Sequence, residues 1–376
     1  MAGIYIHIPF CKTRCIYCDF YSTTRSELKS RYIHALCKEL QMRKEYLRGE
    51  PVETVYFGGG TPSQLAEEDF REVFETIRKY YGMEHCREIT LEANPDDLTP
   101  DYIAMLRTLP FNRLSMGIQT FNESILKVLQ RRHTARQAIE AFQNCRAAGF
   151  QNISIDLMYG LPGETLSTWQ QDLDQALLLH PEHLSAYHLI YEEDTVLWKL
   201  REQHKVEEAD EDLSVSLFST LIDRLTSEGY DHYEISNFSL PGLYSRHNSS
   251  YWTEKKYLGC GPSAHSYNGV SRQWNVASLD TYIKGISAGT PVFEIEELDL
   301  YTRYNDFVIT RIRTEWGMPL SKLRDEFGEK LYDYCLRMAA PHLKQGTLEL
   351  VNDILKLTRK GIFISDGIMS DMLWTD

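Results

Sequence analysis

The segment Cys11-Lys-Thr-Arg-Cys15-Ile-Tyr-Cys18 places three thiols on one short stretch of chain, with three and then two residues between them. Before it, Ile4-Tyr-Ile6-His-Ile8 has the alternation of a β-strand. Pro9 cannot donate to a sheet ladder, so the strand should end there and a loop begin. The three thiols are therefore predicted on a loop at the carboxyl end of a first strand, where parallel α/β folds bind ligands.

Three thiolates on one loop can hold three corners of a four-iron cluster and leave the last iron open to a small molecule, whereas a cluster held only by protein takes four. Zinc is the competing interpretation, but a structural zinc site takes four protein ligands, often as two separated pairs. The other cysteines are far apart, and the chain is too long to suggest a disulfide framework. These singletons are Cys37, Cys86, Cys145, Cys260 and Cys335.

Composition limits the classes of protein that fit. The chain has 376 residues, of which 43% are hydrophobic and 25% charged, as in a soluble globular protein. We expect no transmembrane helix, because no run of about 18 apolar residues occurs, and no signal peptide, because a strand pattern begins at once. Unpaired thiols favour a cytoplasmic location. The net charge of −14 disfavours nucleic acid as a partner.

Strand patterns alternate with helical patterns along the first half of the chain. Strands are predicted at residues 4–8, 52–57, 88–95, 113–119, 152–163 and 183–190, the third and fifth ending in turn signals at Pro95 and Pro162-Gly163, and helices between them, such as residues 26–48. Six strands separated by helices predict an α/β fold with a parallel sheet. Glu92, Gln119 and Asp156 each fall at or near the carboxyl end of such a strand, where a barrel carries its site.

A glycine turn follows the second predicted strand. Gly58-Gly-Gly60 lets the backbone approach a ligand closely, because no Cβ intervenes, and Thr61-Pro62 comes next. The turn lacks the lysine and the spacing of a phosphate-binding P-loop. Alone it is more often a tight turn than a site, but beside the cysteine loop it favours a binding site.

The cysteine spacing, with Tyr17 before the last cysteine, and the Gly-Gly-Gly-Thr-Pro run resemble the signatures of the radical S-adenosylmethionine (SAM) superfamily. The resemblance implies a partial (β/α)6 TIM-like barrel. It also implies that Cys11, Cys15 and Cys18 hold a [4Fe-4S] cluster whose open iron binds SAM. In that family the cluster passes an electron to SAM and releases a 5′-deoxyadenosyl radical.

Residues 1 to about 270 are similar, position by position, to a subgroup that includes the oxygen-independent coproporphyrinogen oxidases. That similarity implies the residues that contact SAM. They are Tyr5, Gly59, Gly60, Thr61, Glu92, Gln119, Arg131, Asp156 and Ala186.

A second motif, His247-Asn-Ser-Ser-Tyr251-Trp252, follows a stretch of loop composition at residues 236–242. A histidine beside two aromatic residues offers a nitrogen to haem iron and flat apolar surface to a macrocycle, although such groups usually only pack. The motif resembles the H-N-x-x-Y-W sequence of HemW-like haem chaperones. That resemblance implies haem as cargo, with His247 as axial ligand beside Tyr251 and Trp252. His265 and Cys260, in the glycine loop that follows, are weaker candidates.

Two departures from the oxidases favour the chaperone. Phe20 stands where the oxidases carry a fourth cysteine, and only ten residues precede Cys11, where the oxidases have a long extension. We therefore expect a protein that delivers haem to respiratory or other haem proteins, with peripheral contact to membrane proteins. The alternative is oxidative decarboxylation of coproporphyrinogen III in porphyrin biosynthesis. Whether the chain is an enzyme stays open, and no catalytic residue is assigned.

The chain is predicted to have three parts: a radical SAM core over residues 1–235, a connecting region over 236–297 and a small C-terminal domain over 298–376. Helical patterns at residues 301–313, 319–327 and 331–344, followed by a hairpin, are typical of a winged helix. The region is nearly charge-balanced, which favours a lid or a partner-docking module over DNA binding.

Overall fold

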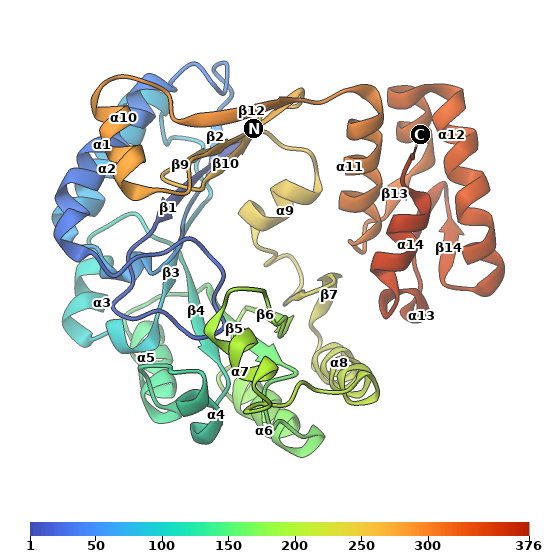
Figure 1. The fold of residues 1–376 in the computed structure, drawn as a ribbon, viewed down its shortest axis with the longest axis horizontal. Coiled ribbons are helices and arrows are strands. Elements are labelled where there is room, and N and C mark those ends of the chain that lie inside the picture. The colour runs from blue at the N-terminus through green and yellow to red at the C-terminus, as the bar shows by residue number, and fades with distance from the viewer. Residues whose placement is uncertain (376) are drawn as a thin grey trace.

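The computed structural model describes residues 1–375. Its centre is a twelve-stranded sheet in the order β12-β11-β10-β9-β1-β2-β3-β4-β5-β6-β8-β7, which curves around an inner side (Figure 1). The first six strands are parallel, as the sequence predicts. They are β1 Ala2–Ile8, β2 Val52–Gly59, β3 Glu88–Ala93, β4 Arg113–Gln119, β5 Ile153–Tyr159 and β6 His183–His188.

Helices follow each of these strands and pack on the outside of the sheet (Figure 1). The longer ones follow the predicted periodicity, although the helix expected over residues 26–48 already ends at Met42. The α-helices of this part are α1 Lys29–Met42, α2 Glu67–Tyr81, α3 Pro100–Leu106, α4 Glu123–Val128, α5 Ala135–Ala147, α6 Leu166–Leu178, α7 Val196–Glu202 and α8 Glu211–Ser227. Three short 3₁₀ turns precede helices: η1 Ser26–Leu28, η2 Pro62–Gln64 and η3 Pro95–Asp97.

Residues 236–297, predicted as a connecting region, extend the central sheet on both sides. β8 and β7 continue it beyond β6, and β9 pairs parallel with β1 on the opposite flank. The stretch at residues 236–242, predicted as loop, therefore contains a strand. The elements of this part of the sheet are β7 Asp231–Glu234, β8 Asn237–Ser239, α9 Arg246–Trp252, β9 Tyr257–Cys260, β10 His265–Tyr267, β11 Ser271–Asn275, α10 Leu279–Ser287 and β12 Phe293–Glu297.

The C-terminal domain has its own hydrophobic core, separate from that of the sheet. A three-stranded sheet in the order β13-β15-β14 packs with helices, in agreement with the predicted winged-helix-like pattern. The two helices predicted at 319–344 are the two halves of α12, which Gly328 interrupts with a φ of +79°. The elements are α11 Leu300–Ile312, β13 Met318–Pro319, α12 Leu320–Gln345, β14 Leu348–Val351, β15 Ile354–Leu357, α13 Arg359–Ile362 and α14 Ser365–Met372.

Strand alternation gives the parallel sheet two different faces. The face under the helices is apolar, with side chains such as Ile6 and Leu114 fully buried. The inner face carries many polar side chains, and on β3, β4 and β6 they become more exposed toward the carboxyl ends of the strands. A parallel sheet buried on both faces would be apolar on both. The polar inner face therefore suits a bound ligand. Its more exposed end lies at the edge that carries the cysteine loop.

Within residues 1–375, every helix is too short or too polar to span a lipid bilayer.

Candidate functional site

The cysteine loop leaves β1 at its carboxyl end, as predicted. Cys11, Cys15 and Cys18 are unpaired and half-buried. Two polar side chains point at their sulfurs: Thr61 donates from Oγ1 to Cys11 Sγ at 3.2 Å, and Arg131 donates from Nη1 to Cys15 Sγ at 3.3 Å. Burial raises the pKa of Cys11 and that of Cys18, the latter to about 11. Donors of this kind stabilise thiolates, the form in which cysteine binds metal.

An apolar anchor fixes the middle of this loop. Ile16 is buried in a small cluster at the carboxyl ends of β5 and β6, where it packs with residues such as Leu189 and Leu197. Its carbonyl oxygen accepts the main-chain N–H of Leu197 at 2.9 Å. Phe20, just after the last cysteine, is 64% exposed. The loop is therefore held by its apolar residue, while its three cysteines stay only half-buried.

The glycine turn at the end of β2 lies against the start of the cysteine loop. Gly60 donates its N–H to the carbonyl of Ile8 at 2.8 Å. A Cβ on Gly60 would meet that same carbonyl oxygen at 2.9 Å, so a side chain would push the two segments apart. Gly59 has a φ of +107°, which a side chain rarely tolerates. The turn thus brings bare backbone beside the three thiols.

Two carboxylates lie on the inner face below this rim. Glu92 accepts the Tyr56 hydroxyl at 2.8 Å and the N–H of Gly59 at 3.2 Å. Asp156 accepts the hydroxyl of Ser115 at 3.2 Å. Burial raises the pKa of Glu92 to about 7 and that of Asp156 to about 6. Carboxylates in this environment suit the ammonium and hydroxyl groups of a ligand, because such groups would offset the cost of burying charge.

The other predicted SAM contacts divide into two groups. Tyr5 and Gln119 lie on strands that line the interior, and Gln119 holds a φ of +71° at the bulge that ends β4. Arg131 reaches the same rim through hydrogen bonds to Asn94 Oδ1 at 2.8 Å and to the Gly117 carbonyl at 2.5 Å. Ala186 differs, because its side chain packs in the hydrophobic core on the helix-covered face. Any contact of Ala186 with a ligand must therefore come from its main chain.

Sequence reasoning missed Arg113, although it begins the fourth predicted strand. This side chain is 1% exposed, and its Nε and Nη1 find no partner among residues 1–375. Its neighbour in register, Thr90, also has an unpartnered hydroxyl. The positive charge of Arg113 lowers the pKa of both Glu92 and Asp156, in opposition to burial. The available signal was a charged residue inside a predicted strand. An arginine is almost never buried without a partner, so its position in a strand should have suggested one.

The His-Asn-x-x-Tyr-Trp motif forms α9, which lies inside the curve of the sheet (Figure 1). The carboxylate of Glu88 accepts the first two N–H groups of this helix, those of Arg246 at 2.8 Å and His247 at 2.9 Å. A carboxylate at a helix N-terminus satisfies free donors and offsets the helix dipole. Glu88 is at the amino end of β3, so α9 closes the interior at the end opposite the cysteine loop.

The imidazole of His247 is 1% exposed, and both its nitrogens are engaged. Nδ1 lies 2.8 Å from the Thr54 hydroxyl and Nε2 lies 2.9 Å from that of Tyr251. The ring stacks on Tyr56 at 5.0 Å between centroids, and Tyr56 in turn bonds Glu92. In this arrangement His247 offers no free nitrogen to haem iron and instead supports the residue that holds Glu92.

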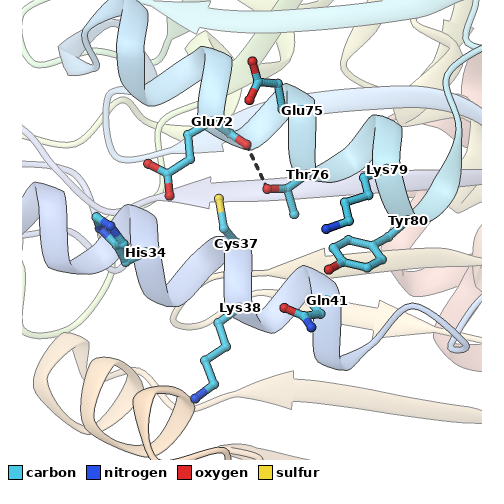
Figure 2. A pocket seen from close by; sticks show the side chains of 9 residues that line it. All are labelled: His34, Cys37, Lys38, Gln41, Glu72, Glu75, Thr76, Lys79 and Tyr80. Atoms are coloured by element: carbon cyan, nitrogen blue, oxygen red, sulfur yellow. Dashed lines mark hydrogen bonds between the residues drawn. The ribbon is translucent and has the colours of Figure 1, made fainter.

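The outer surface carries a separate groove of about 480 Å³ between α1 and α2. Figure 2 shows its polar lining, in which the Thr76 hydroxyl donates to the Glu72 carbonyl. Its residues are His34, Cys37, Lys38, Gln41, Glu72, Glu75, Thr76, Lys79 and Tyr80. The groove lies on the helix-covered side of the sheet, so it is not part of the interior site. Within residues 1–375, no three His, Cys, Asp or Glu side chains are grouped closely enough to hold a single metal ion.

Comparison with known proteins agrees with this geometry. Residues 5–176 match the Radical SAM superfamily and residues 298–364 match the HemN C-terminal domain. The chain is 33% identical to Heme chaperone HemW of Mycobacterium tuberculosis over 99% of its own length and 94% of that protein. It is 31% identical to Heme chaperone HemW of Bacillus subtilis over 99% of both chains.

The fold has a close counterpart among solved structures. Coproporphyrinogen III oxidase (HemN) from Escherichia coli, described as a radical SAM enzyme, superposes with a TM-score of 0.86 over 99% of this chain and 89% of that one. At 23% identity this likeness concerns the fold alone. It confirms the predicted α/β architecture with its C-terminal helical domain. The full-length relatives decide the family: this chain belongs to the HemW family within the radical SAM superfamily.

Proposed function

We propose that this protein binds a [4Fe-4S] cluster and SAM, binds haem, and delivers the haem to haem proteins such as those of respiration. The observation that carries the proposal is the convergence of three unpaired thiols, a bare glycine turn and Glu92 on one rim. It occurs in a chain related over its full length to proteins named heme chaperones. Cytoplasmic location is part of the proposal, since unpaired, half-buried thiols suit a reducing compartment.

Cys11, Cys15 and Cys18 would hold the cluster, and the arrangement around them fits such a group. Arg131 and Thr61 already direct donors at two of the sulfurs. Gly59 and Gly60 let the turn pack directly against the end of β1 and the start of the loop, which brings their backbone beside the thiols. When bound, the cluster supplies one electron at low potential and an open iron for SAM. Glu92 and Asp156 would orient SAM from the inner face, and the interior would exclude bulk water around it.

Haem ligation by His247, with Tyr251 and Trp252 beside the macrocycle, stays a prediction. It requires Nε2 of His247 to release the Tyr251 hydroxyl and the ring to leave its stack on Tyr56. Because Glu88 holds the N-terminus of α9 through two N–H groups, the whole helix would have to move away from β3.

The decisive experiment is a haem titration of anaerobically purified protein with its cluster in place. We expect saturable binding of ferric haem, seen as a shift of the Soret band, followed by transfer of that haem to an apo-haem protein. The same sample is then given SAM and coproporphyrinogen III, and we expect no release of CO2. Absence of saturable haem binding would overturn the proposal, whereas CO2 release would assign the chain to the oxidases instead.

SAM binding should strengthen as the pH rises. The pKa of Glu92, raised to about 7 by burial, means that its carboxylate ionises between about pH 6 and pH 8. SAM carries positive charge on its amino group and its sulfonium, so it prefers the ionised form. We expect the Kd for SAM to fall by about tenfold over that range, measured by calorimetry.

The matched control for this pH dependence is Glu92→Gln. The amide oxygen of glutamine can accept the N–H of Gly59 while its NH2 group donates to the Tyr56 hydroxyl oxygen, and the amide does not titrate. Any pH effect that arises at the cluster will be the same in both proteins. A wild-type Kd that does not change with pH, or an equal change in the variant, would show that Glu92 is not the group that titrates.

A further inference from the structure

His265 differs from the histidines of the barrel interior in having a free ring. His7, His183 and His247 are buried, and each ring makes hydrogen bonds. The His265 side chain is exposed, and within residues 1–375 its imidazole makes no hydrogen bond. Both ring nitrogens are thus available to a ligand, as a metal-binding histidine requires.

The register of the sheet places His265 on the inner face. Its neighbour Ser266 turns the other way and, with Gln273, accepts hydrogen bonds from the buried guanidinium of Arg43, just after α1, at 3.1 and 2.6 Å. Because side chains alternate along a strand, His265 and its cross-strand partner Trp274 lie on the opposite face. This is the face to which Tyr5 belongs.

His265 and Trp274 form an aromatic pair on this face. Their ring centroids are 6.2 Å apart with an angle of 29° between the planes. Tyr267 follows two residues along the same strand and stands over Tyr257 of β9, at 6.3 Å between centroids. A free imidazole in a row of half-buried aromatic rings matches a flat conjugated macrocycle with a central metal.

The position along the strands brings His265 to the rim of the cluster loop. β9 runs parallel to β1 with Cys260 opposite Ile6, so the turn after it lies at the carboxyl end of β1. Gly259 allows the chain to fold back there, because a Cβ at this position would meet the His265 carbonyl oxygen at 2.0 Å. A ligand on His265 would therefore lie at the same edge as the cysteine loop.

We propose that His265 is an axial ligand of the haem iron and that Trp274 packs against the macrocycle, an inference that rests on the proposed haem-binding function. Partial burial and the nearby Arg272 lower the pKa of His265, which keeps the imidazole neutral as iron ligation requires. Arg272 lies on the same face and pairs with Glu296 and Asp306. The arrangement places the cargo at the mouth of the barrel, where an acceptor protein can reach it.

The test is a haem titration of cluster-loaded His265→Ala and His265→Gly, with His247→Ala and His85→Ala as comparisons. His85 is an exposed histidine in the connection between α2 and β3 and serves as a surface control. We expect the His265 variants to bind haem on the order of tenfold more weakly or worse, with a Soret band that reports loss of a nitrogen ligand. Added imidazole should restore the band in His265→Gly. Trp274→Leu should weaken binding and leave the ligand spectrum unchanged.

The outcomes separate this inference from the function on which it rests. Wild-type protein that binds no haem overturns the proposed function itself. If the wild-type protein binds haem and His265→Ala binds it with the same affinity and spectrum, the inference is overturned. If haem affinity is lost only in His247→Ala, the axial ligand is assigned to α9. Rescue by imidazole in His265→Gly cannot come from misfolding, because a misfolded variant would not regain the wild-type spectrum.

Discussion

Replacing Cys18 by alanine is expected to abolish the iron–sulfur cluster and SAM binding together, with little change in the fold. The loop depends on the buried side chain of Ile16 and its bond to Leu197, neither of which involves Cys18. Two remaining thiolates cannot hold a cluster that needs three, and without its open iron SAM loses its main point of attachment. Iron and sulfide analysis, with calorimetric titration of SAM, measures both losses.

Cys37→Ala is the matched control for this variant. Cys37 is also half-buried and unpaired, but it lines the outer groove between α1 and α2 (Figure 2). We expect this variant to retain about four irons per chain and normal SAM affinity. A Cys18→Ala protein that keeps its iron and sulfide would remove the basis of the assignment. If the wild-type protein carries zinc and no sulfide, the cysteine motif is a zinc site and not a cluster site.

The sequence predicted the parallel core well because its signals are local. The strand expected at residues 113–119 has the same bounds in the structure, and the other five overlap their predicted ranges, although those of β3 and β5 ran on into the turns at Pro95 and Pro162. The placement of Glu92 and Asp156 near the carboxyl ends of neighbouring parallel strands was predicted in the same way, from the strand pattern alone. Each of these inferences needed only a short window of chain.

The parts that the sequence did not predict depend on contacts between distant residues. The position of α9 is decided by the carboxylate of Glu88, more than 150 residues earlier, so nothing in the motif reveals that His247 is buried. The same holds for Arg113, whose strand lies between β3 and β5, so that its neighbours come from distant parts of the sequence. The free ring of His265 also depends on tertiary structure, through the fold-back that Gly259 permits. A local sequence pattern places residues on strands, but it does not predict which imidazole ring will lack a hydrogen-bond partner.

The contact between the C-terminal domain and the barrel should weaken when Arg313 is replaced by methionine. Arg313, at the end of α11, donates from Nε to Glu234 Oε1 at 2.7 Å, and its guanidinium lies 4.3 Å from the ring centre of Trp252. Glu234 is 1% exposed, so the variant leaves a buried carboxylate without its cation. We expect a loss of about 3 kcal/mol in the free energy of unfolding, measured by denaturant titration.

The cause can be tested with a compensating change and a control. Glu234→Gln in the Arg313→Met background removes the unpaired charge but can still accept the N–H of Ser236, so it should recover more than half of the lost stability. Arg324→Ala lies on α12 and pairs only within the C-terminal domain, and it should cost about 1 kcal/mol or less.

Because Trp252 belongs to α9 and α9 supports Glu92 through His247 and Tyr56, the same variant should also weaken SAM binding. Hydrogen exchange is expected to rise in α9 and at the end of α11 in Arg313→Met, and to stay unchanged in Arg324→Ala. If exchange rises only in α11 while SAM affinity stays at the wild-type value, the domain contact stabilises the chain without reaching the cofactor site. If both change together, the C-terminal domain controls the barrel interior through α9, and docking of an acceptor on that domain becomes a means of acting on bound SAM.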